Sequence, residues 1–312
     1  MAAPPRRILI TGAAGFVGRH LKARLAAAYP DAALFTPTVD VRDAEAVADT
    51  VRQAAPEACI HLAAVSSIRA AQADEDQAWE VNLHGTLRVA RAILRHAPDC
   101  QMLFTSTADA YGSSFRGGAP VDEGTPLAPM SVYSATKAAA DLAIGSMVGQ
   151  GLRCVRIRPF NHTGPGQTAQ FVVPAFARQI ARIEAGLQPP LIQVGNIDTW
   201  RDFLDVRDAC AGYLACIGLG DRLTCGSILN LASGTARRIG DILSELQALA
   251  GIALEVRPDP ARVRDSDVPM ACGDSRRARE LLGWAPVIPW AQTLLDVLDD
   301  WRVRIRSEAQ GS

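Results

Sequence analysis

The sequence predicts an α/β fold with a doubly wound parallel sheet, followed by a second and smaller α/β domain. Short apolar runs of strand length alternate with stretches of helical spacing through the first half of the chain. Runs as apolar as these indicate strands that helices cover on both faces. A glycine-rich turn follows the first run, and proline and glycine become frequent from about residue 159. That change of texture marks the expected start of the second domain.

The first half can be assigned element by element. The run "RRILIT" at residues 6–11 predicts a strand, and the spacing of apolar residues from Phe16 predicts a helix after it. Further strands are expected in "AALFT", "ACIHLAA", "QMLFTS" and "LRCVRIRP", with helices at about 43–55, 75–96 and 131–149. The later segment "WRDFLDVRDACAGYLACI" reads as a helix that returns to the first sheet.

Composition limits the classes of function. A chain of 312 residues with 48% apolar residues can bury one large core or two smaller ones that meet at a cleft. The net charge is −1 and the basic residues are spread along the chain, so neither a nucleic acid nor a membrane is an expected partner. No window approaches membrane-spanning length, and no signal-peptide pattern is present. We therefore expect a cytoplasmic protein that acts on a small molecule.

The cysteines and lysines are informative by their distribution. The seven cysteines are odd in number and show no CxxC spacing, which predicts reduced thiols and no metal site.

Among 32 basic residues, lysine occurs only at Lys22 and Lys137. A chain that otherwise uses arginine keeps a lysine where a compact ammonium is required.

The segment "TGAAGFVG" places three glycines at the junction of the first strand and the first helix. Glycine lets the backbone turn sharply and lets a pyrophosphate approach the helix N-terminus, where unpaired amides favour anions. Elsewhere such a triplet could be an ordinary turn, but at the head of an α/β half it indicates a dinucleotide site. The residues expected to bind the cofactor here are Gly12, Gly15, Phe16, Val17 and Gly18.

The spacing GxxGxxG resembles that of the extended short-chain dehydrogenase/reductase superfamily, and further matches follow in chain order. "HLAA" at 61–64 resembles the motif that lines the cofactor, and Asn82 in "EVNLHGT" matches a structural asparagine. "STADAYG" at 106–112 matches the segment of the catalytic serine or threonine, and "YSATK" at 133–137 matches YxxxK. The resemblance covers essentially the whole chain and implies an NAD(P)-dependent oxidoreductase. It also implies that the cofactor contacts Leu62, Ala63, Ala64, Tyr133 and Lys137.

The residues Tyr133, Lys137 and Thr107 form the expected catalytic set. Tyr133 and Lys137 are four residues apart on a predicted helix, so their side chains share one face. An ammonium beside a phenol should lower the pKa of the phenol and let it transfer a proton at a carbonyl oxygen. Thr107 would hydrogen-bond the same oxygen.

The residues after Thr107 discriminate between reactions. In the nucleotide-sugar 4,6-dehydratases of this superfamily, the catalytic threonine precedes two further proton-transfer groups. Here the first position is Ala108, which cannot transfer a proton, and the second is Asp109. Elimination is therefore disfavoured, whereas reduction of a carbonyl needs no further group. Asp109 is expected to order the loop or to contact a sugar hydroxyl, and a catalytic role is the alternative.

The second half resembles the GDP-mannose branch of the superfamily, through residues 158–167, 171–186 and 194–208. By that resemblance Asn161 and Arg201 hold the diphosphate or ribose of the substrate, and Arg264 and Asp267 line its nucleotide end. Planar guanidinium groups suit a diphosphate because they bind it bidentately. A surface salt bridge is the alternative for Arg264. His162 is expected to be structural.

The change of texture near residue 159 and the returning segment predict a division of the chain into two domains. Residues 1–163 would form the dinucleotide-binding Rossmann domain, with a returning segment at about 197–235. Residues 164–196 and 236–312 would form the domain that binds the nucleotide sugar.

The choice between NAD and NADP depends on the segment after the second strand, where the adenosine ribose is read. NAD enzymes usually place an acid there and NADP enzymes an arginine, but Thr36, Pro37 and Thr38 supply neither. By the resemblance, Asp40 and Val41 contact the adenine. The expected cofactor is NADP or NAD, with a slight preference for NADPH.

The resulting prediction is an enzyme that uses NAD(P)H to reduce the C4 keto group of a GDP-linked 4-keto-6-deoxy sugar, giving GDP-D-rhamnose. One alternative is a 4,6-dehydratase or 4-epimerase with tightly bound NAD(P). Another is a non-catalytic dinucleotide-sensing scaffold, which would not need Thr107, Tyr133 and Lys137 together. A homodimer is also expected, because the helices at about 75–96 and 131–149 correspond to those of a four-helix interface in the superfamily. The second of these helices carries a stripe of small residues: Ala135, Ala138, Ala139 and Ala143.

Overall fold

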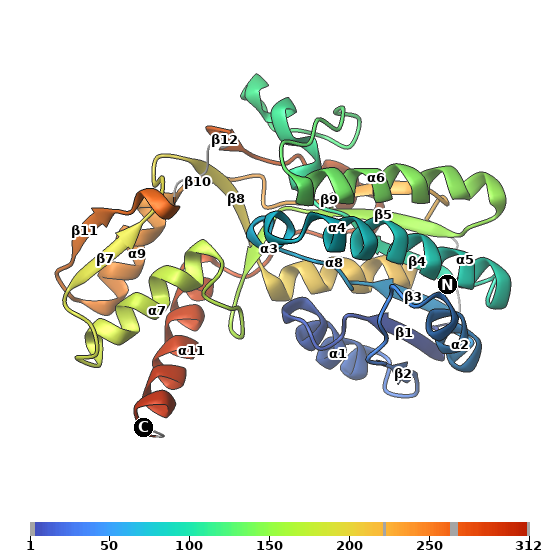
Figure 1. Cartoon of the computed structure of the whole chain (residues 1–312), viewed down its shortest axis with the longest axis horizontal. Helices are drawn as coiled ribbons and strands as arrows, with labels where there is room; N and C mark the ends of the chain where they lie inside the picture. Colours follow the sequence, from blue (N-terminus) through green and yellow to red (C-terminus); the bar gives the residue numbers. More distant parts are fainter. Residues whose placement is uncertain (1–3, 221–222, 263–267, 311–312) are drawn as a thin grey trace.

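The central element of the protein is a parallel sheet, seen at the right of Figure 1. The computed structural model describes residues 4–220, 223–262 and 268–310. Within these residues the sheet has six strands in the order β2-β1-β3-β4-β5-β9, and every neighbouring pair is parallel. The strands are β1 (Arg7–Thr11), β2 (Ala33–Phe35), β3 (Ala58–His61), β4 (Gln101–Thr105), β5 (Cys154–Pro159) and β9 (Ser227–Leu231).

Helices cover both faces of this sheet. On one face, α1 (Phe16–Ala28) and α8 (Val206–Leu219) enclose a core that includes Ile10 and Ile157. On the other face, α2 (Ala44–Ala54), α5 (Thr86–His96) and α6 (Val132–Met147) enclose a core around Leu9 and Phe104. The predicted fold class, a doubly wound parallel sheet of the Rossmann type, is confirmed. Strand order reverses between β1 and β3, which is where ligands bind in such sheets.

Shorter helices connect these layers. The stretch predicted as one helix at about 75–96 consists of α4 (Glu75–Trp79), a π-helix η1 (Glu80–Gly85) and α5, and α3 (Ile68–Ala73) precedes them. The 3₁₀ segment η2 (Ala108–Gly117) follows β4, and η3 (Val148–Gln150) follows α6.

A smaller unit lies to the left in Figure 1. Its helices α7 (Val172–Glu184), α9 (Ile239–Ala250) and α11 (Trp290–Gln310) share a separate apolar core with Ile192 and Phe203. β7 (Leu191–Val194) pairs with β11 (Glu255–Pro258), and β8 (Trp200–Asp205) pairs with β6 (Asn161–Thr163), β10 (Ala236–Arg238) and β12 (Met270–Ala271). The short η5 (Pro260–Arg262) and α10 (Arg276–Leu282) are the remaining elements of the described residues.

One expected element differs from the prediction. The segment at 200–217 is not helical throughout, because Trp200–Asp205 forms strand β8 and the helix α8 begins at Val206. Asp205 ends the strand and caps the helix by accepting a hydrogen bond from the backbone amide of Arg207. The helical part does return to the first sheet, where it packs beside α1. In the described residues, no helix is long and apolar enough to cross a membrane.

Candidate active site

The glycine loop lies between β1 and α1, and its three glycines are needed for close contacts. Gly12 has φ +73°, and a Cβ there would lie 2.7 Å from the backbone nitrogen of Ala63. A Cβ on Gly18 would lie 2.6 Å from the backbone of Ala13. Gly15, which caps α1, would meet the carbonyl oxygen of Gly12 at 3.2 Å. The chain is thus folded tightly here, and the space at Gly12 and Gly18 excludes any side chain.

The loop has the properties of a pyrophosphate site. The N-terminus of α1 has no side-chain cap, so the amides of its first turn, which include Phe16 and Val17, have no acceptor within the helix. The residues Leu62, Ala63 and Ala64 follow β3. This strand pairs with β1 on one side, so the three residues lie beside the glycine loop. The sequence-predicted cofactor residues of these two loops are brought together, and the donor set fits a dinucleotide.

The threonine and tyrosine that the sequence predicts to be catalytic meet at the carboxyl end of β4. Thr107 is 8% exposed and caps η2 by accepting a hydrogen bond from the amide of Asp109, 3.2 Å away. The side chain of Thr107 also hydrogen-bonds Tyr133, which lies in the first turn of α6. A capping box between Ser131 and Ser134 fixes the start of that helix.

The electrostatics of Tyr133 differ from the sequence prediction. Burial and then the nearby carboxylate of Asp109 raise the pKa of Tyr133, and the hydrogen bond from Thr107 opposes them. The ammonium of Lys137 donates a hydrogen bond to the carbonyl oxygen of Thr105 and sits 4.5 Å from the centre of the Phe104 ring. The expectation that Lys137 lowers the pKa of the phenol toward neutrality is therefore wrong for this arrangement. Instead, burial lowers the pKa of Lys137 to about 7, against a smaller opposing effect of Asp141.

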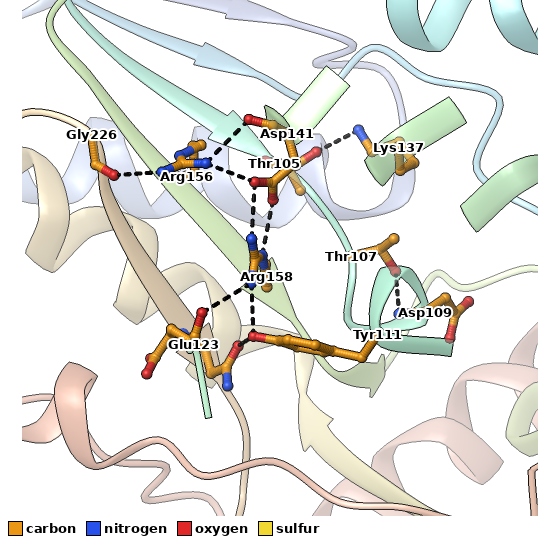
Figure 2. Close-up of polar contacts among 11 residues, drawn as sticks. Thr105, Thr107, Asp109, Tyr111, Glu123, Lys137, Asp141, Arg156, Arg158 and Gly226 are labelled. Carbon is orange, nitrogen blue, oxygen red and sulfur yellow. Dashed lines mark hydrogen bonds and ion pairs between the residues drawn. The ribbon is translucent and has the colours of Figure 1, made fainter. Parts of the chain in front are cut away.

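A buried ionic network anchors the helix that carries Tyr133 and Lys137 (Figure 2). Asp141, one turn after Lys137, is fully buried and accepts hydrogen bonds from Arg156 at 3.1 Å and from Arg158 at 2.9 and 3.0 Å. Arg158 also donates to the hydroxyl of Tyr111, which donates to Asn230. The network joins α6 to β5, η2 and β9. Sequence reasoning missed it, although charged residues within apolar strand patterns were a signal.

The residues expected at the adenine are found just before α2. Asp40 is half-exposed and paired with Arg42 at 2.7 Å, and hydrogen bonds from Arg42 lower the pKa of its carboxyl group to about 2. Val41 is buried, and a Cβ on Gly85 would come within 2.6 Å of its side chain. Val41 therefore packs beneath the π-helix.

The residues expected to bind the substrate lie on β6 and β8. Asn161 pairs with Phe203 of the neighbouring strand, and its side-chain amide donates to the backbone oxygen of Asp202 at 3.5 Å. Arg201, on β8, donates to the carbonyl oxygen of Val268 at 2.9 Å. Two other predicted substrate residues, Arg264 and Asp267, lie outside the described residues. Strand pairing thus places Asn161 on the strand beside that of Arg201, opposite a position two residues further along β8.

Two further residues organise this region. His162 stacks on Phe16 with ring centres 6.2 Å apart, which joins β6 to the start of α1. Asp202 is fully buried and accepts hydrogen bonds from the backbone amides of Ser233 at 2.8 Å, Gly234 at 2.9 Å and Gly273 at 3.2 Å. It fixes the strand of Arg201 against two loops. Nothing in the local sequence distinguished Asp202 from an exposed aspartate.

Comparison with known proteins agrees with this geometry. The family model described as GDP-mannose 4,6 dehydratase matches residues 29–296. GDP-6-deoxy-D-mannose reductase of Pseudomonas aeruginosa is 36% identical, over 97% of this chain and 99% of that protein. GDP-6-deoxy-D-talose 4-dehydrogenase of Aggregatibacter actinomycetemcomitans is 26% identical, over 89% of this chain and 91% of that protein.

Solved structures give the same grouping. The structure of RMD from Pseudomonas aeruginosa complexed with NADPH superimposes with a TM-score of 0.88 at 34% identity, covering 96% of this chain and 99% of that one. UDP-glucose 4-epimerase of Thermus thermophilus complexed with NAD gives a TM-score of 0.83 at 26% identity, covering 95% and 99%. The resemblance to the extended short-chain dehydrogenase/reductase superfamily is confirmed.

Proposed function

The chain belongs to the GDP-mannose 4,6-dehydratase family, and we propose that it acts there as a reductase of a GDP-linked 4-keto-6-deoxy sugar. The product would be GDP-D-rhamnose. The observation that carries the proposal is the side chain beside the Thr107–Tyr133 pair. It is Ala108, 6% exposed, which offers no proton for the departure of a hydroxyl group. The similarity to GDP-6-deoxy-D-mannose reductase over nearly the whole chain supports the same activity.

The proposed reaction adds a hydride and a proton to the C4 carbonyl group. NADPH, when bound, supplies the hydride to C4. Tyr133 donates its phenolic proton to the C4 oxygen and regains one from solvent. Because burial and Asp109 raise the pKa of Tyr133, the phenol is protonated at neutral pH, as a proton donor must be. Thr107 orients that hydroxyl and the carbonyl oxygen.

Other residues are proposed to bind rather than to react. The amides at the start of α1 would hold the pyrophosphate of the cofactor, and Leu62, Ala63 and Ala64 would line its adenosine side, with Asp40 and Val41 at the adenine. Lys137, whose ammonium group donates to the carbonyl oxygen of Thr105, would hold the nicotinamide side. Asn161 and Arg201 would hold the diphosphate or ribose of the sugar nucleotide, with Arg264 and Asp267 at its base.

We also propose that the protein prefers NADPH to NAD. The predicted division into two domains and the predicted cytoplasmic location belong to the same proposal. NADPH is favoured because Thr36, Pro37 and Thr38, which follow β2, place no carboxylate there that would repel a 2′-phosphate. The RMD structure with NADPH supports this choice, and the epimerase structure with NAD leaves NAD as the alternative.

The test compares two substrates. With NADPH, the protein should oxidise one equivalent of cofactor per GDP-4-keto-6-deoxy-mannose and leave GDP-mannose unchanged. A specific observation favours a dehydratase as the second candidate, since Asp109 stands near Tyr133 and its carboxylate can accept a proton. Conversion of GDP-mannose to the 4-keto-6-deoxy sugar without added reductant would establish that alternative and refute the reductase.

We also propose a homodimer through α5 and α6. Leu142 on α6 is 61% exposed and Trp79 on α4 is 36% exposed, so both side chains could be covered by a second subunit. The predicted alanine stripe is only partly available, because Ala138 is buried within the subunit. Leu142→Arg should convert a dimer into a monomer by light scattering, whereas Leu281→Arg on α10, where Leu281 is 48% exposed, should not. A wild-type protein that is monomeric at micromolar concentration would refute the proposal.

A further inference from the structure

A buried histidine that the proposed reaction does not use lies at the end of β3. His61 is 1% exposed, and each of its ring nitrogens faces a threonine hydroxyl. Nδ1 is 2.7 Å from Oγ1 of Thr11, at the end of β1, and Nε2 is 3.0 Å from Oγ1 of Thr86, at the start of α5. The ring therefore bridges the glycine loop and the π-helix side of the site.

The direction of each hydrogen bond follows from the number of available protons. The hydroxyl of Thr86 donates its one proton to the carbonyl oxygen of Asn82 at 2.7 Å. It can then only accept from His61, so Nε2 carries a proton. Burial and then the charge of Lys137 lower the pKa of His61 to about 3, so the ring is neutral and Nδ1 is bare. The hydroxyl of Thr11 must donate to Nδ1.

Both ends of this chain of hydrogen bonds reach the candidate active site. On the cofactor side, Thr11 Oγ1 donates its proton to His61 and can still accept a hydrogen bond. It accepts one from the backbone amide of Ala63 at 3.4 Å. This amide lies close to Gly12, because a Cβ added to Gly12 would be only 2.7 Å from the amide nitrogen. The position of the cofactor loop is thereby coupled to the orientation of one imidazole ring.

On the catalytic side, the chain continues through Asn82. Its side-chain amide donates to Oγ1 of Thr136 at 3.0 Å, and the hydroxyl of Thr136 donates to the backbone oxygen of Tyr133 at 2.8 Å. Asn82 also pairs with both backbone groups of Val65, which follows the "HLAA" segment. Asn82 and Thr136 are both fully buried, so these bonds do not compete with water.

The π-helix η1 explains why these hydrogen bonds are needed. π-helices are rare and frequently occur at functional sites. Here η1 presents Asn82 to the loop after β3 and to α6 at once. The bond from Thr86 to Asn82, and the bond from His61 to Thr86, stabilise that conformation.

We propose that His61, as the neutral Nε2–H tautomer, is a positioning residue that holds the cofactor loop in register with the helix of Tyr133. Among the described residues, Lys137 is the charged group that acts on this ring, and no carboxylate pairs with it. The ring therefore has no partner that would favour its protonated form. The inference rests on the proposed function only for the identity of the cofactor, because the hydrogen-bond directions follow from the protein alone.

The first test is a spectroscopic one on the wild-type protein. In ¹⁵N-detected spectra of the ring nitrogens, assigned sequence-specifically, His61 should show a protonated Nε2 and a bare Nδ1 that do not titrate between pH 5 and 8. A protonated Nδ1, or a titration in that range, would overturn the assignment. This readout needs neither the cofactor nor the sugar.

The second test measures NADPH binding by fluorescence titration, again without sugar. Thr11→Val keeps the shape of the side chain and removes the donor to Nδ1, and we expect it to weaken NADPH binding about tenfold. Thr86→Val should weaken it similarly through the other ring nitrogen. Thr11→Ser, which retains the hydroxyl group, should bind NADPH with the wild-type affinity. Unchanged affinity in both valine variants would show that the ring does not position the loop, whatever the protein does to sugars.

Discussion

Replacing Asp141 by asparagine should destabilise the protein far more than removing an exposed ion pair. The carboxylate is fully buried and accepts three charge-assisted hydrogen bonds from Arg156 and Arg158. Asparagine has nearly the same shape but offers one oxygen, and its amide group points donors at guanidinium donors. Arg158, whose side chain is 3% exposed, is then left without a counter-charge. Loss of one partner of such a pair costs about 3–5 kcal/mol.

The assay is urea unfolding at pH 7, with Asp49→Asn as the matched control. Asp49 pairs with Arg52 on the surface of α2, where both side chains are about half exposed, and such pairs contribute roughly 0–1 kcal/mol. Burial opposes the charged form of Asp141, but the hydrogen bond and charge of Arg158 lower its pKa below the ordinary value. A depressed carboxyl pKa stabilises the fold above the unfolded pKa, so the difference from wild type should shrink as the pH falls below about 4. A cost below about 1 kcal/mol at pH 7 would refute the reasoning.

Three further predictions concern the site itself. Tyr133→Phe should lower the rate of keto-sugar reduction by about 10²–10⁴-fold with NADPH affinity retained, measured by cofactor oxidation and fluorescence titration. The pKa of Lys137 falls from 10.5 to about 7 on folding, so the unfolded state binds more protons between these two pH values. The free energy of unfolding should therefore rise with pH over that range in the wild-type protein. Lys137→Met should remove this rise, as measured by unfolding without cofactor. Gly12→Ala should abolish NADPH binding, since its Cβ would lie 2.7 Å from the nitrogen of Ala63 at a φ of +73°.

Each of these has a distinct contrary result. A Tyr133→Phe enzyme near the wild-type rate would remove the tyrosine from the mechanism. Parallel pH–stability curves for wild type and Lys137→Met would mean that the ammonium stays charged in the folded protein. Gly251→Ala, at a site where a Cβ meets nothing within 4 Å, controls for general effects of alanine at a positive φ, and equal loss of NADPH binding there would refute the steric argument for Gly12.

The sequence predicted the sheet and its loops well because these signals are local. Apolar runs bounded by glycine or proline indicated β1, β3, β4 and β5, and the glycine spacing located the turn after β1. The change from β8 to α8 at Val206 was missed, since Trp200–Asp205 and the helix share similar apolar spacing. Only pairing with β6, β10 and β12 makes that segment a strand.

The roles of the expected site residues stay predictions, and the contacts between those residues were only partly predictable from the sequence. Spacing could place Tyr133 and Lys137 on one helix face, but it could not show that the ammonium of Lys137 turns to the carbonyl oxygen of Thr105. That contact depends on the position of β4 relative to α6, which is tertiary information. The partners of Asp141 and Asp202 likewise come from distant strands and loops.

The measurement that tests the central claim most directly is NMR of the product formed with NADPH deuterated at the transferred position. If the protein is the proposed reductase, GDP-4-keto-6-deoxy-mannose should yield one equivalent of NADP⁺ and a sugar with deuterium at C4 in the rhamnose configuration. Deuterium at C4 in the talose configuration would contradict the assigned product. A sugar without deuterium, with the cofactor returned to its starting state, would contradict the reductase itself.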